Sequence, residues 1–185
     1  MPRIIGVTGT NGAGKGEVVR YLVESLGFMH YSVSDFIVEE ITRNGLTVDR
    51  DNMIMVGNDL RAIFGPAHIV EELYKKASED GGDSVIESLR ALAEMRRVRE
   101  LGGTIIGIDA DVRIRYERIR ARRSSKDAIS FEQFIAQEHS EMNPGNPTKQ
   151  DLRGALARAD VVITNDGTLE ELHGRLDEVL TWARR

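Results

Sequence analysis

A short glycine-rich segment near the start of the chain constrains the fold more than any other feature. It reads Gly9-Thr10-Asn11-Gly12-Ala13-Gly14-Lys15-Gly16. An apolar run at residues 4–7 precedes it, and apolar residues at helical spacing follow it, namely Val18, Val19, Leu22, Val23 and Leu26. This order predicts a buried strand, a tight loop and a helix that begins near Lys15.

The loop has the residues that phosphate binding requires. Glycines place no Cβ in the way, so successive backbone N–H groups can point into one concavity. The helix N-terminus adds a partial positive charge, and Lys15 adds a mobile full charge. The pattern Gly-x-x-x-x-Gly-Lys is complete, so we predict that residues 9–17 bind the phosphates of ATP. The alternative is a glycine turn followed by a lysine without function.

The position after Lys15 departs from the usual pattern. A hydroxyl there normally helps to hold Mg²⁺, whereas this chain has Gly16 followed by Glu17. Glu17 is therefore one candidate for approaching Mg²⁺, directly or through water. The alternative is a negative charge in the first helical turn, where the helix dipole favours it. We expect the metal to depend on water and on other carboxylates.

Composition excludes several classes of protein. The chain has 185 residues, 41% of them hydrophobic, which suits one domain with a substantial core. A net charge of -5 argues against a protein that coats nucleic acid. The absence of cysteine excludes disulfides, thiolate metal sites and zinc nucleobase deaminases. There is no signal peptide and no apolar stretch of roughly 20 residues, so we expect a cytoplasmic protein outside membranes. The sequence does not indicate an oligomeric state.

Strand and helix patterns alternate along the chain, which predicts a parallel sheet with helices on both faces. Strands are expected at residues 3–8, 28–32, 83–87, 103–109 and 160–164. Helices are expected at residues 15–26, 34–44, 51–64, 67–78, 91–101, 112–123, 131–142, 151–158 and 168–183. Ser34 or Asp35 is expected to cap the second helix. We therefore predict one domain over residues 1–185, an α/β three-layer P-loop fold with a five-stranded parallel sheet.

Two other classes of P-loop protein fit less well than a small kinase. A GTPase carries a guanine-reading Asn-Lys-x-Asp late in the chain, but the final turn here reads Asn165-Asp166-Gly167-Thr168. A large AAA-type motor needs a longer chain and paired acids after one strand, whereas the strand at residues 103–109 ends in a single acid. A small P-loop kinase core is the prediction.

Four segments in order resemble the nucleoside monophosphate kinase and dephospho-CoA kinase group. They are the phosphate loop, whose Gly14-Lys15-Gly16 is similar to the Gly-Lys-Gly-Thr of adenylate kinases, residues 32–35, residues 87–90 and residues 163–172. The resemblance covers nearly all of the chain, which also resembles small uncharacterised kinase-like proteins. It implies transfer of the γ-phosphoryl group of ATP to a nucleoside or deoxynucleoside monophosphate, or to dephospho-CoA. It also implies an acceptor-binding helical insert at about residues 34–80 and a lid at about residues 118–130.

Asp35 follows the second strand, at the edge of the sheet where ligands bind in open α/β folds. A carboxylate there could order water on Mg²⁺ or accept the proton of the attacking hydroxyl, and capping the next helix is the alternative role. In adenylate kinases an arginine lies three residues after the matching aspartate. This chain has Val38 at that position, which argues against AMP as the acceptor.

Two arginines are candidates for the acceptor phosphate. Arg61 lies just before the break at residues 64–66, and its alternative role is that of a solvated helix arginine. Arg90 ends a turn that resembles the Asp-Gly-x-x-Arg or Asp-Gly-x-Arg turn of the group, in which the arginine binds acceptor phosphate and the acid lies near the metal. Glu87 replaces the aspartate and Ser88 the glycine, so Glu87 is the second metal candidate.

The densest basic stretch contains Arg113, Arg115, Arg118, Arg120, Arg122 and Arg123. Arg115, Arg118 and Arg122 share one helix face at this spacing. The resemblance implies lid arginines that exclude water and stabilise charge on the transferred phosphoryl group, with Arg118 and Arg122 in that role. The alternatives are a solvated helix face and an RNA-binding patch, although the interleaved aromatic residues of single-strand binders are missing.

The turn at residues 165–168 follows the last predicted strand. In the resembled enzymes this turn lies against adenine through backbone groups, which makes Asn165 and Gly167 candidates for nucleotide contact. The alternative is a turn closed by a capping box of Thr168 and Glu171.

Three functional classes stay open from the sequence. The first is an ATP-dependent kinase for a small nucleotide-type acceptor. The second is a non-catalytic nucleotide sensor or regulatory P-loop ATPase, which would bind ATP without acceptor-dependent turnover. The third is an RNA-associated ATPase, whose binding would fall steeply with salt.

Overall fold

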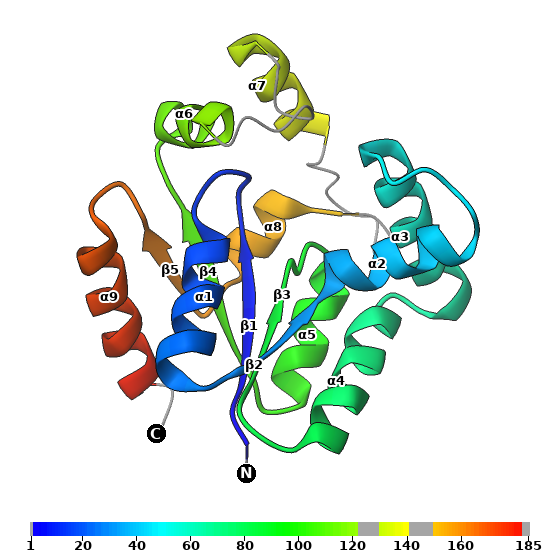
Figure 1. Cartoon of the computed structure of the whole chain (residues 1–185), viewed down its shortest axis with the longest axis horizontal. Helices are drawn as coiled ribbons and strands as arrows, with labels where there is room; N and C mark the ends of the chain where they lie inside the picture. Colours follow the sequence, from blue (N-terminus) through cyan, green and yellow to red (C-terminus); the bar gives the residue numbers. More distant parts are fainter. Residues whose placement is uncertain (1, 122–129, 141–149, 183–185) are drawn as a thin grey trace.

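The computed structural model of the chain describes residues 2–121, 130–140 and 150–182 (Figure 1). Its strands are β1 (Ile4–Gly9), β2 (Met29–Ser32), β3 (Ser84–Glu87), β4 (Thr104–Asp109) and β5 (Val161–Thr164). They form one parallel sheet in the order β2-β3-β1-β4-β5. The predicted five-stranded parallel sheet is confirmed, because each apolar run is a strand and each return along the chain is helical.

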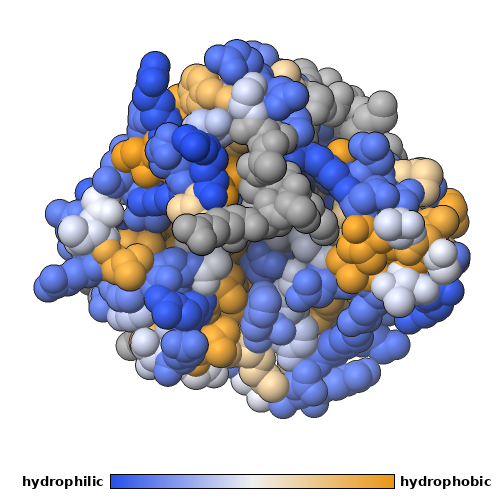
Figure 2. All heavy atoms as spheres, turned by 45° about the horizontal axis from the view of Figure 1, so that its top comes forward, coloured by the Kyte–Doolittle hydropathy of each residue, from blue (hydrophilic) through white to orange (hydrophobic). Residues whose placement is uncertain are grey.

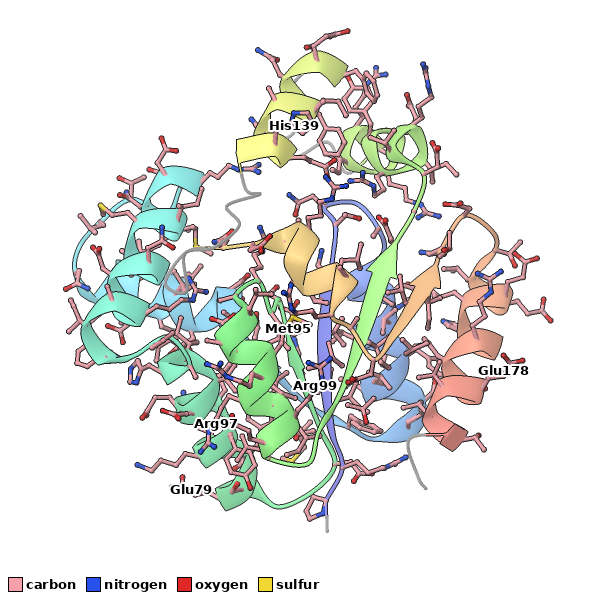
Figure 3. The ribbon with its side chains drawn as sticks, turned by 180° about the vertical axis from the view of Figure 1, so that it is seen from behind. Glu79, Met95, Arg97, Arg99, His139 and Glu178 are labelled. Carbon is pink, nitrogen blue, oxygen red and sulfur yellow. The ribbon has the colours of Figure 1, made fainter. Side chains whose placement is uncertain are left out.

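Helices cover both faces of this sheet. α1 (Lys15–Leu26) and α9 (Leu169–Trp182) pack on one face, around Val7, Ile106 and Ile108. α4 (His68–Asp80), α5 (Leu92–Glu100) and α8 (Leu152–Ala157) pack on the other. Figure 3 shows this second face from behind, with α5 and its labelled Met95 across the sheet. The two cores make the three layers that the alternating pattern predicts.

α2 (Val33–Arg43) and α3 (Arg50–Phe64) lie to one side of the carboxyl ends of β2 and β3 (Figure 1). The N-cap of α2 is Ser32, whose Oγ accepts a hydrogen bond from the Asp35 N–H at 3.1 Å. The expectation that Ser34 or Asp35 caps this helix is therefore wrong. The helix begins one residue earlier because the hydroxyl at the end of β2 reaches the free N–H first.

α6 (Val112–Ala121) and α7 (Phe131–Ser140) lie beyond the carboxyl ends of the strands (Figure 1). The Tyr116 ring of α6 packs on Phe131 and Phe134 of α7, with ring centroids 5.2 and 5.8 Å apart. Most of the predicted lid at residues 118–130, including Arg122, lies outside the described residues. No helix in the described part of the chain is both long and apolar enough to cross a bilayer.

The side of the molecule formed by α3 carries exposed apolar side chains. Ile63 and Phe64 are 72% and 61% exposed, and Met55 on the same helix is also exposed. Figure 2 shows hydrophobic residues gathered on that side, whereas most of the remaining visible surface is hydrophilic. Apolar groups of this size cost free energy in water, but nothing in the structure identifies what would cover them.

β1 depends on a glycine at its centre. A Cβ on Gly6 would lie 2.6 Å from Ile105 Cδ1 and 2.8 Å from Leu89 Cδ1, and both of these side chains are fully buried. We predict that Gly6→Ala lowers the free energy of unfolding by about 1–3 kcal/mol, because two fully buried side chains would have to shift from their packed positions.

The control for this prediction is Gly174→Ala, in the middle of α9, where a Cβ meets nothing within 4 Å. Alanine there should raise the free energy of unfolding by roughly 0.5–1 kcal/mol through helix propensity. Urea unfolding of both variants measures the difference, and equal effects would contradict the packing argument.

Candidate active site

Three glycines of the phosphate loop have backbone conformations that other residues avoid. Gly9, Gly12 and Gly14 have φ values of 149°, 81° and 102°. A Cβ on Gly9 would collide with the Ile108 carbonyl of β4, and one on Gly12 would lie 2.5 Å from the Arg115 carbonyl of α6. A Cβ on Gly14 would collide with the Asn165 amide. The loop therefore keeps an open concavity only because these positions carry no side chain.

Lys15 lies at the mouth of this loop. Its Nζ donates hydrogen bonds to the carbonyls of Gly9 and Thr10, both at 2.8 Å. A lysine amine over a glycine cradle at a helix N-terminus is a suitable site for an anionic phosphate chain. The residues of this segment fit nucleotide phosphates on the geometry of their own backbone.

Neighbouring elements fix the walls of the loop. The Thr10 hydroxyl donates to Asp109 Oδ1 at 2.6 Å. The Asn165 amide donates to the Ala13 carbonyl at 2.8 Å, and Arg118 Nη1 donates to the Asn165 carbonyl at 2.9 Å. Asn165 and Arg118 thus form one chain of hydrogen bonds that ends on the phosphate loop.

The turn after β5 also has the capping box that the sequence predicts. The Thr168 N–H donates to Glu171 at 2.9 Å, and the Glu171 N–H donates to the Thr168 hydroxyl at 3.2 Å. Gly167 lies against the Glu171 carboxylate, where a Cβ would collide. The capping role is confirmed, and contact of this turn with adenine stays a prediction.

A cavity of about 610 Å³ opens between the phosphate loop, α2, α3 and α7. Of the residues predicted for the site, it brings together Asn11, Gly12, Gly14, Lys15, Gly16, Arg61, Glu87 and Arg90. Apolar side chains of α2, α3, α6 and α7 line the rest, namely Val33, Ile37, Met53, Ile54, Ile119 and Phe134. Asp35, Glu17 and Arg118 are not among its lining residues.

Arg61 is buried in the wall of this cavity, with 1% of its side chain exposed. Its Nε donates to Glu94 Oε1 at 2.7 Å, while its Nη1 is buried and has no partner among the described residues. Burial of an unpaired guanidinium donor costs free energy. The alternative of a solvated helix arginine is therefore wrong, and Nη1 is an unpaired donor buried in the wall of the cavity.

Glu94 fixes two parts of the site at once. Its second oxygen, Oε2, accepts the backbone N–H groups of Arg90 at 3.2 Å and of Ala91 at 3.1 Å. The Arg90 guanidinium reaches Asn11 Oδ1 at 3.1 Å and Gln150 Oε1 at 3.5 Å. Arg90 therefore lies beside the phosphate loop, and one buried carboxylate positions both candidate arginines.

The turn that carries Glu87 is strained at Ser88, which has a φ of 64°. Glycine is the residue that adopts this conformation most readily. The Ser88 hydroxyl donates to Glu87 Oε2 at 2.6 Å, which supplies a local reason for a serine here. Ser32, which also donates at 2.6 Å, holds the other carboxylate oxygen.

Glu87 is ionised in this environment. Burial by itself raises the pKa of its carboxyl, but contacts with His30, Ser32 and Ser88 outweigh it and lower the pKa to about 2. His30 Nε2 lies 3.8 Å from Glu87 Oε1, and this carboxylate raises the pKa of the imidazole. The cavity therefore contains a fixed negative charge at the end of β3.

The other predicted carboxylates lie elsewhere. Glu17 is bound by Arg20 at 2.6 Å and by His173 at 3.2 Å, and the hydrogen bond from Arg20 is the main cause of its lowered pKa. The Asp35 side chain is exposed in the first turn of α2. The described residues contain no group of three or more acids or histidines arranged to hold a metal. A Mg²⁺ ion here would need phosphate oxygens and water to complete its coordination.

Arg115 differs from the role that its helix face suggests. It is buried and paired with Glu138 of α7, and it donates to the carbonyls of Ala110 at 2.9 Å and Asn11 at 3.2 Å. A shared face with Arg118 and Arg122 therefore does not make it a free lid arginine. Arg122 lies outside the described residues.

Sequence reasoning missed Glu94, Gln150, Asp49 and Arg50, which support or line the cavity. It also did not select His30, which contacts Glu87. The one available signal was Glu94 at the fourth residue after Arg90, early in a predicted helix. The remaining contacts join residues far apart in the sequence, where spacing carries no signal.

Comparison with known proteins agrees with this P-loop architecture. A family model described as "AAA domain" matches residues 5–143. A UPF0200 protein of Pyrobaculum aerophilum is 32% identical, covering 97% of this chain and 98% of its own. Another UPF0200 protein, from Hyperthermus butylicus, is 30% identical and covers 96% and 93%. The chain therefore belongs to the AAA-domain family, and it also belongs to the UPF0200 proteins. The expectation that it is not a large AAA-type motor stays a prediction.

Solved structures share the fold. A Thermus thermophilus protein has a TM-score of 0.63 at 24% identity and covers 97% of both chains. A shikimate kinase from Bacteroides thetaiotaomicron has a TM-score of 0.61 at 16% identity, covering 97% of this chain and 98% of its own. These likenesses establish a kinase-like P-loop fold. They do not establish membership in the nucleoside monophosphate or dephospho-CoA kinase group.

The His30–Glu87 pair predicts a pH-dependent contribution to stability. The pKa of His30 is raised in the folded state, so its contribution is fully present below the ordinary value of 6.5 and is lost as pH rises through the folded-state pKa. Glu87 stays ionised throughout this range, since its pKa is about 2. His30→Gln should therefore lower the free energy of unfolding by at most about 1 kcal/mol near pH 5.5, and by much less near pH 8.5.

Urea unfolding at the two pH values measures this difference, with the exposed His139→Gln as the control. A loss for His30→Gln that is the same at both pH values would contradict the pairing.

Proposed function

We propose that this protein is an ATP-dependent kinase that transfers the γ-phosphoryl group to a small anionic acceptor of nucleotide type. The observation that carries the proposal is the single cavity shared by the phosphate loop and by Arg61, whose buried Nη1 has no partner among the described residues. A nucleotide site alone would not require an arginine of α3 buried in the wall of the same cavity. An acceptor that brings its own negative charge accounts for it.

The phosphate loop binds the donor in this proposal. Lys15 leaves the carbonyls of Gly9 and Thr10 and contacts the phosphates, and the backbone N–H groups of the loop point at the same anion. Asn165 and Arg118 keep the loop in place through the Ala13 carbonyl. ATP supplies the phosphoryl group, and the chain supplies position and electrostatic stabilisation.

The acceptor lies between α2 and α3, against Arg61 and Arg90. Val33, Ile37 and Met53 form an apolar wall suited to a flat ring. Asp49 can accept hydrogen bonds from ligand hydroxyls, and Ser34 can donate to them or accept from them. A base, a sugar and a phosphate fit this combination, so a nucleoside monophosphate and dephospho-CoA are both retained as candidates.

Glu87 is the best-placed carboxylate for Mg²⁺, which would neutralise charge between the donor phosphates when bound. It lines the cavity, it is ionised, and its two oxygens accept from Ser32 and Ser88. Glu17 is occupied by Arg20 and His173 on the other side of α1. We assign no proton transfer to Asp35, because its side chain is exposed and does not line the cavity.

A panel assay tests this function. The protein is incubated with MgATP and ribo- and deoxynucleoside monophosphates, dephospho-CoA, shikimate or gluconate, and ADP formation is measured. We expect one nucleotide-type acceptor to accelerate ADP formation, and Lys15→Ala to remove at least about 99% of the rate. Lys75→Ala, an exposed lysine of α4, is the matched control.

Two results would contradict the proposal. Turnover only with shikimate or gluconate would place the acceptor in another class. ADP formation that no acceptor increases, or ATP binding without turnover, would favour a regulatory ATPase or a nucleotide sensor.

Arg61→Lys tests the acceptor side with the acceptor found in that panel. Lysine can keep the charge opposite Glu94 but cannot also present a second donor to the cavity. We expect KM for the acceptor to rise roughly 10- to 100-fold, with KM for ATP nearly unchanged. Arg43→Lys on the exposed side of α2 is the control, and an equal rise in both KM values for Arg61→Lys would exclude a role specific to the acceptor.

A further inference from the structure

α7 lies above the carboxyl ends of the strands, beside α6 and across the cavity from α3 (Figures 1 and 3, where His139 marks α7). Two adjacent residues of this helix, Gln137 and Glu138, contact different parts of the site. Gln137 faces the acceptor side, and Glu138 faces the phosphate loop. This arrangement links the two halves of the cavity through one short helix.

The contact on the donor side is a buried ion pair. Only 7% of the Arg115 side chain and 6% of the Glu138 side chain are exposed. The Glu138 carboxylate accepts hydrogen bonds from both terminal nitrogens of the guanidinium, Nη1 and Nη2, and the bond from Nη2 measures 3.0 Å. Phe134 of the same helix packs under the guanidinium, with Cζ 5.5 Å from the ring centroid. Such a pair requires both charges, because a lone buried charge is costly.

The same guanidinium holds the phosphate loop. Arg115 Nη1 donates to the Asn11 carbonyl at 3.2 Å, and Nε donates to the Ala110 carbonyl at 2.9 Å. Gly12, the next residue of the loop, lies against the Arg115 backbone so closely that a Cβ would not fit. The orientation of the Asn11–Gly12 peptide therefore depends on where Arg115 lies, and Glu138 determines that position.

The contact on the acceptor side is made by the preceding residue. Gln137 Oε1 accepts from Arg50 Nη1 of α3 at 3.0 Å, and both side chains line the cavity. This hydrogen bond links α3, on the acceptor side of the cavity, to the helix that holds the phosphate loop. The planar guanidinium of Arg115 donates hydrogen bonds to four oxygens from three segments of the chain. Lysine cannot reproduce this geometry.

We propose that Glu138 is a positioning residue for the phosphate loop, acting through Arg115, and that α7 thereby couples nucleotide binding to the acceptor side of the cavity. This inference deepens the proposed function and rests on it, since it assumes that the loop binds nucleotide. It assigns to α7 a role in forming the donor site in addition to covering it. Thermodynamic linkage then requires that nucleotide binding in turn stabilises the docked α7.

The first test uses Glu138→Gln, which is isosteric and removes the charge. ADP with Mg²⁺ is the probe, and its affinity is measured by titration calorimetry on the full chain. We expect the dissociation constant to rise about tenfold or more. Glu117→Gln on the exposed side of α6 is the matched control and should change the affinity less than about twofold.

Hydrogen exchange separates positioning from simple loss of structure. In the wild-type protein, ADP should slow exchange both in the phosphate loop and in α7, because the two are coupled. In Glu138→Gln the loop should still be protected by the ADP that binds, while the protection of α7 by ADP is lost. A cooperative thermal unfolding transition that is retained in Glu138→Gln confirms that the fold of the sheet core remains.

Arg115→Lys provides an independent variant. It keeps a charge opposite Glu138, so α7 stays docked, but it loses the bond to the Asn11 carbonyl. We expect weaker ADP binding with α7 exchange in the free protein close to that of the wild type. Wild-type ADP affinity in both variants would overturn the coupling while leaving the kinase proposal intact. Failure of the wild-type protein to bind ADP or ATP would overturn the proposed function, and the coupling with it.

Discussion

The phosphate loop is the constraint on which the rest of the site depends. Its curvature requires positive φ values at Gly9, Gly12 and Gly14, and each of these glycines lies against a different element. β4, α6 and the turn after β5 therefore surround the loop closely at these three positions. Thr10 and Asn165 add hydrogen bonds from the same neighbours. Preorganised donors of this kind cost little reorganisation when an anion binds.

Two buried ion pairs position the residues that surround the phosphate loop. Glu94 fixes Arg61 and the backbone before α5, and Glu138 fixes Arg115 beside the loop. Ion pairs of this type add little net stability compared with apolar residues, but breaking one is costly. Their main effect is geometric, because one holds Arg61 in the cavity wall and the other holds Arg115 against the phosphate loop. The donor and acceptor halves of the site are thus held by separate carboxylates, one on α5 and one on α7.

The fold could be predicted from the sequence because its signals are local. Apolar runs and helical spacing located every strand and helix of the described chain to within about two residues, and the glycine loop indicated the order of strand, loop and helix at its start.

Candidate site residues were predicted only where a motif contained them, as for Lys15, Arg90 and Glu87. Arg61, which the sequence analysis selected, lines the cavity, but its partner Glu94 lies 33 residues away, and no spacing indicates such a pair. Asp35 was taken for a cap or a base because acids favour both places, yet Ser32 reaches the free N–H first. Arg115 was grouped with the lid arginines because helical spacing shows which residues share a face of the helix. It does not show that another helix, α7, packs on that face.

The central claim is that this loop is a preorganised phosphate site. Titration calorimetry of MgATP with the wild-type protein and with Gly12→Ala tests it most directly. The account predicts that the wild-type protein binds MgATP and that Gly12→Ala weakens binding at least about 100-fold, because a Cβ there meets the Arg115 backbone. Gly174→Ala in α9, where a Cβ meets open space, should bind as the wild type does. Equal affinity in Gly12→Ala, or no binding by the wild-type protein, would contradict the account of this loop as a preorganised phosphate site.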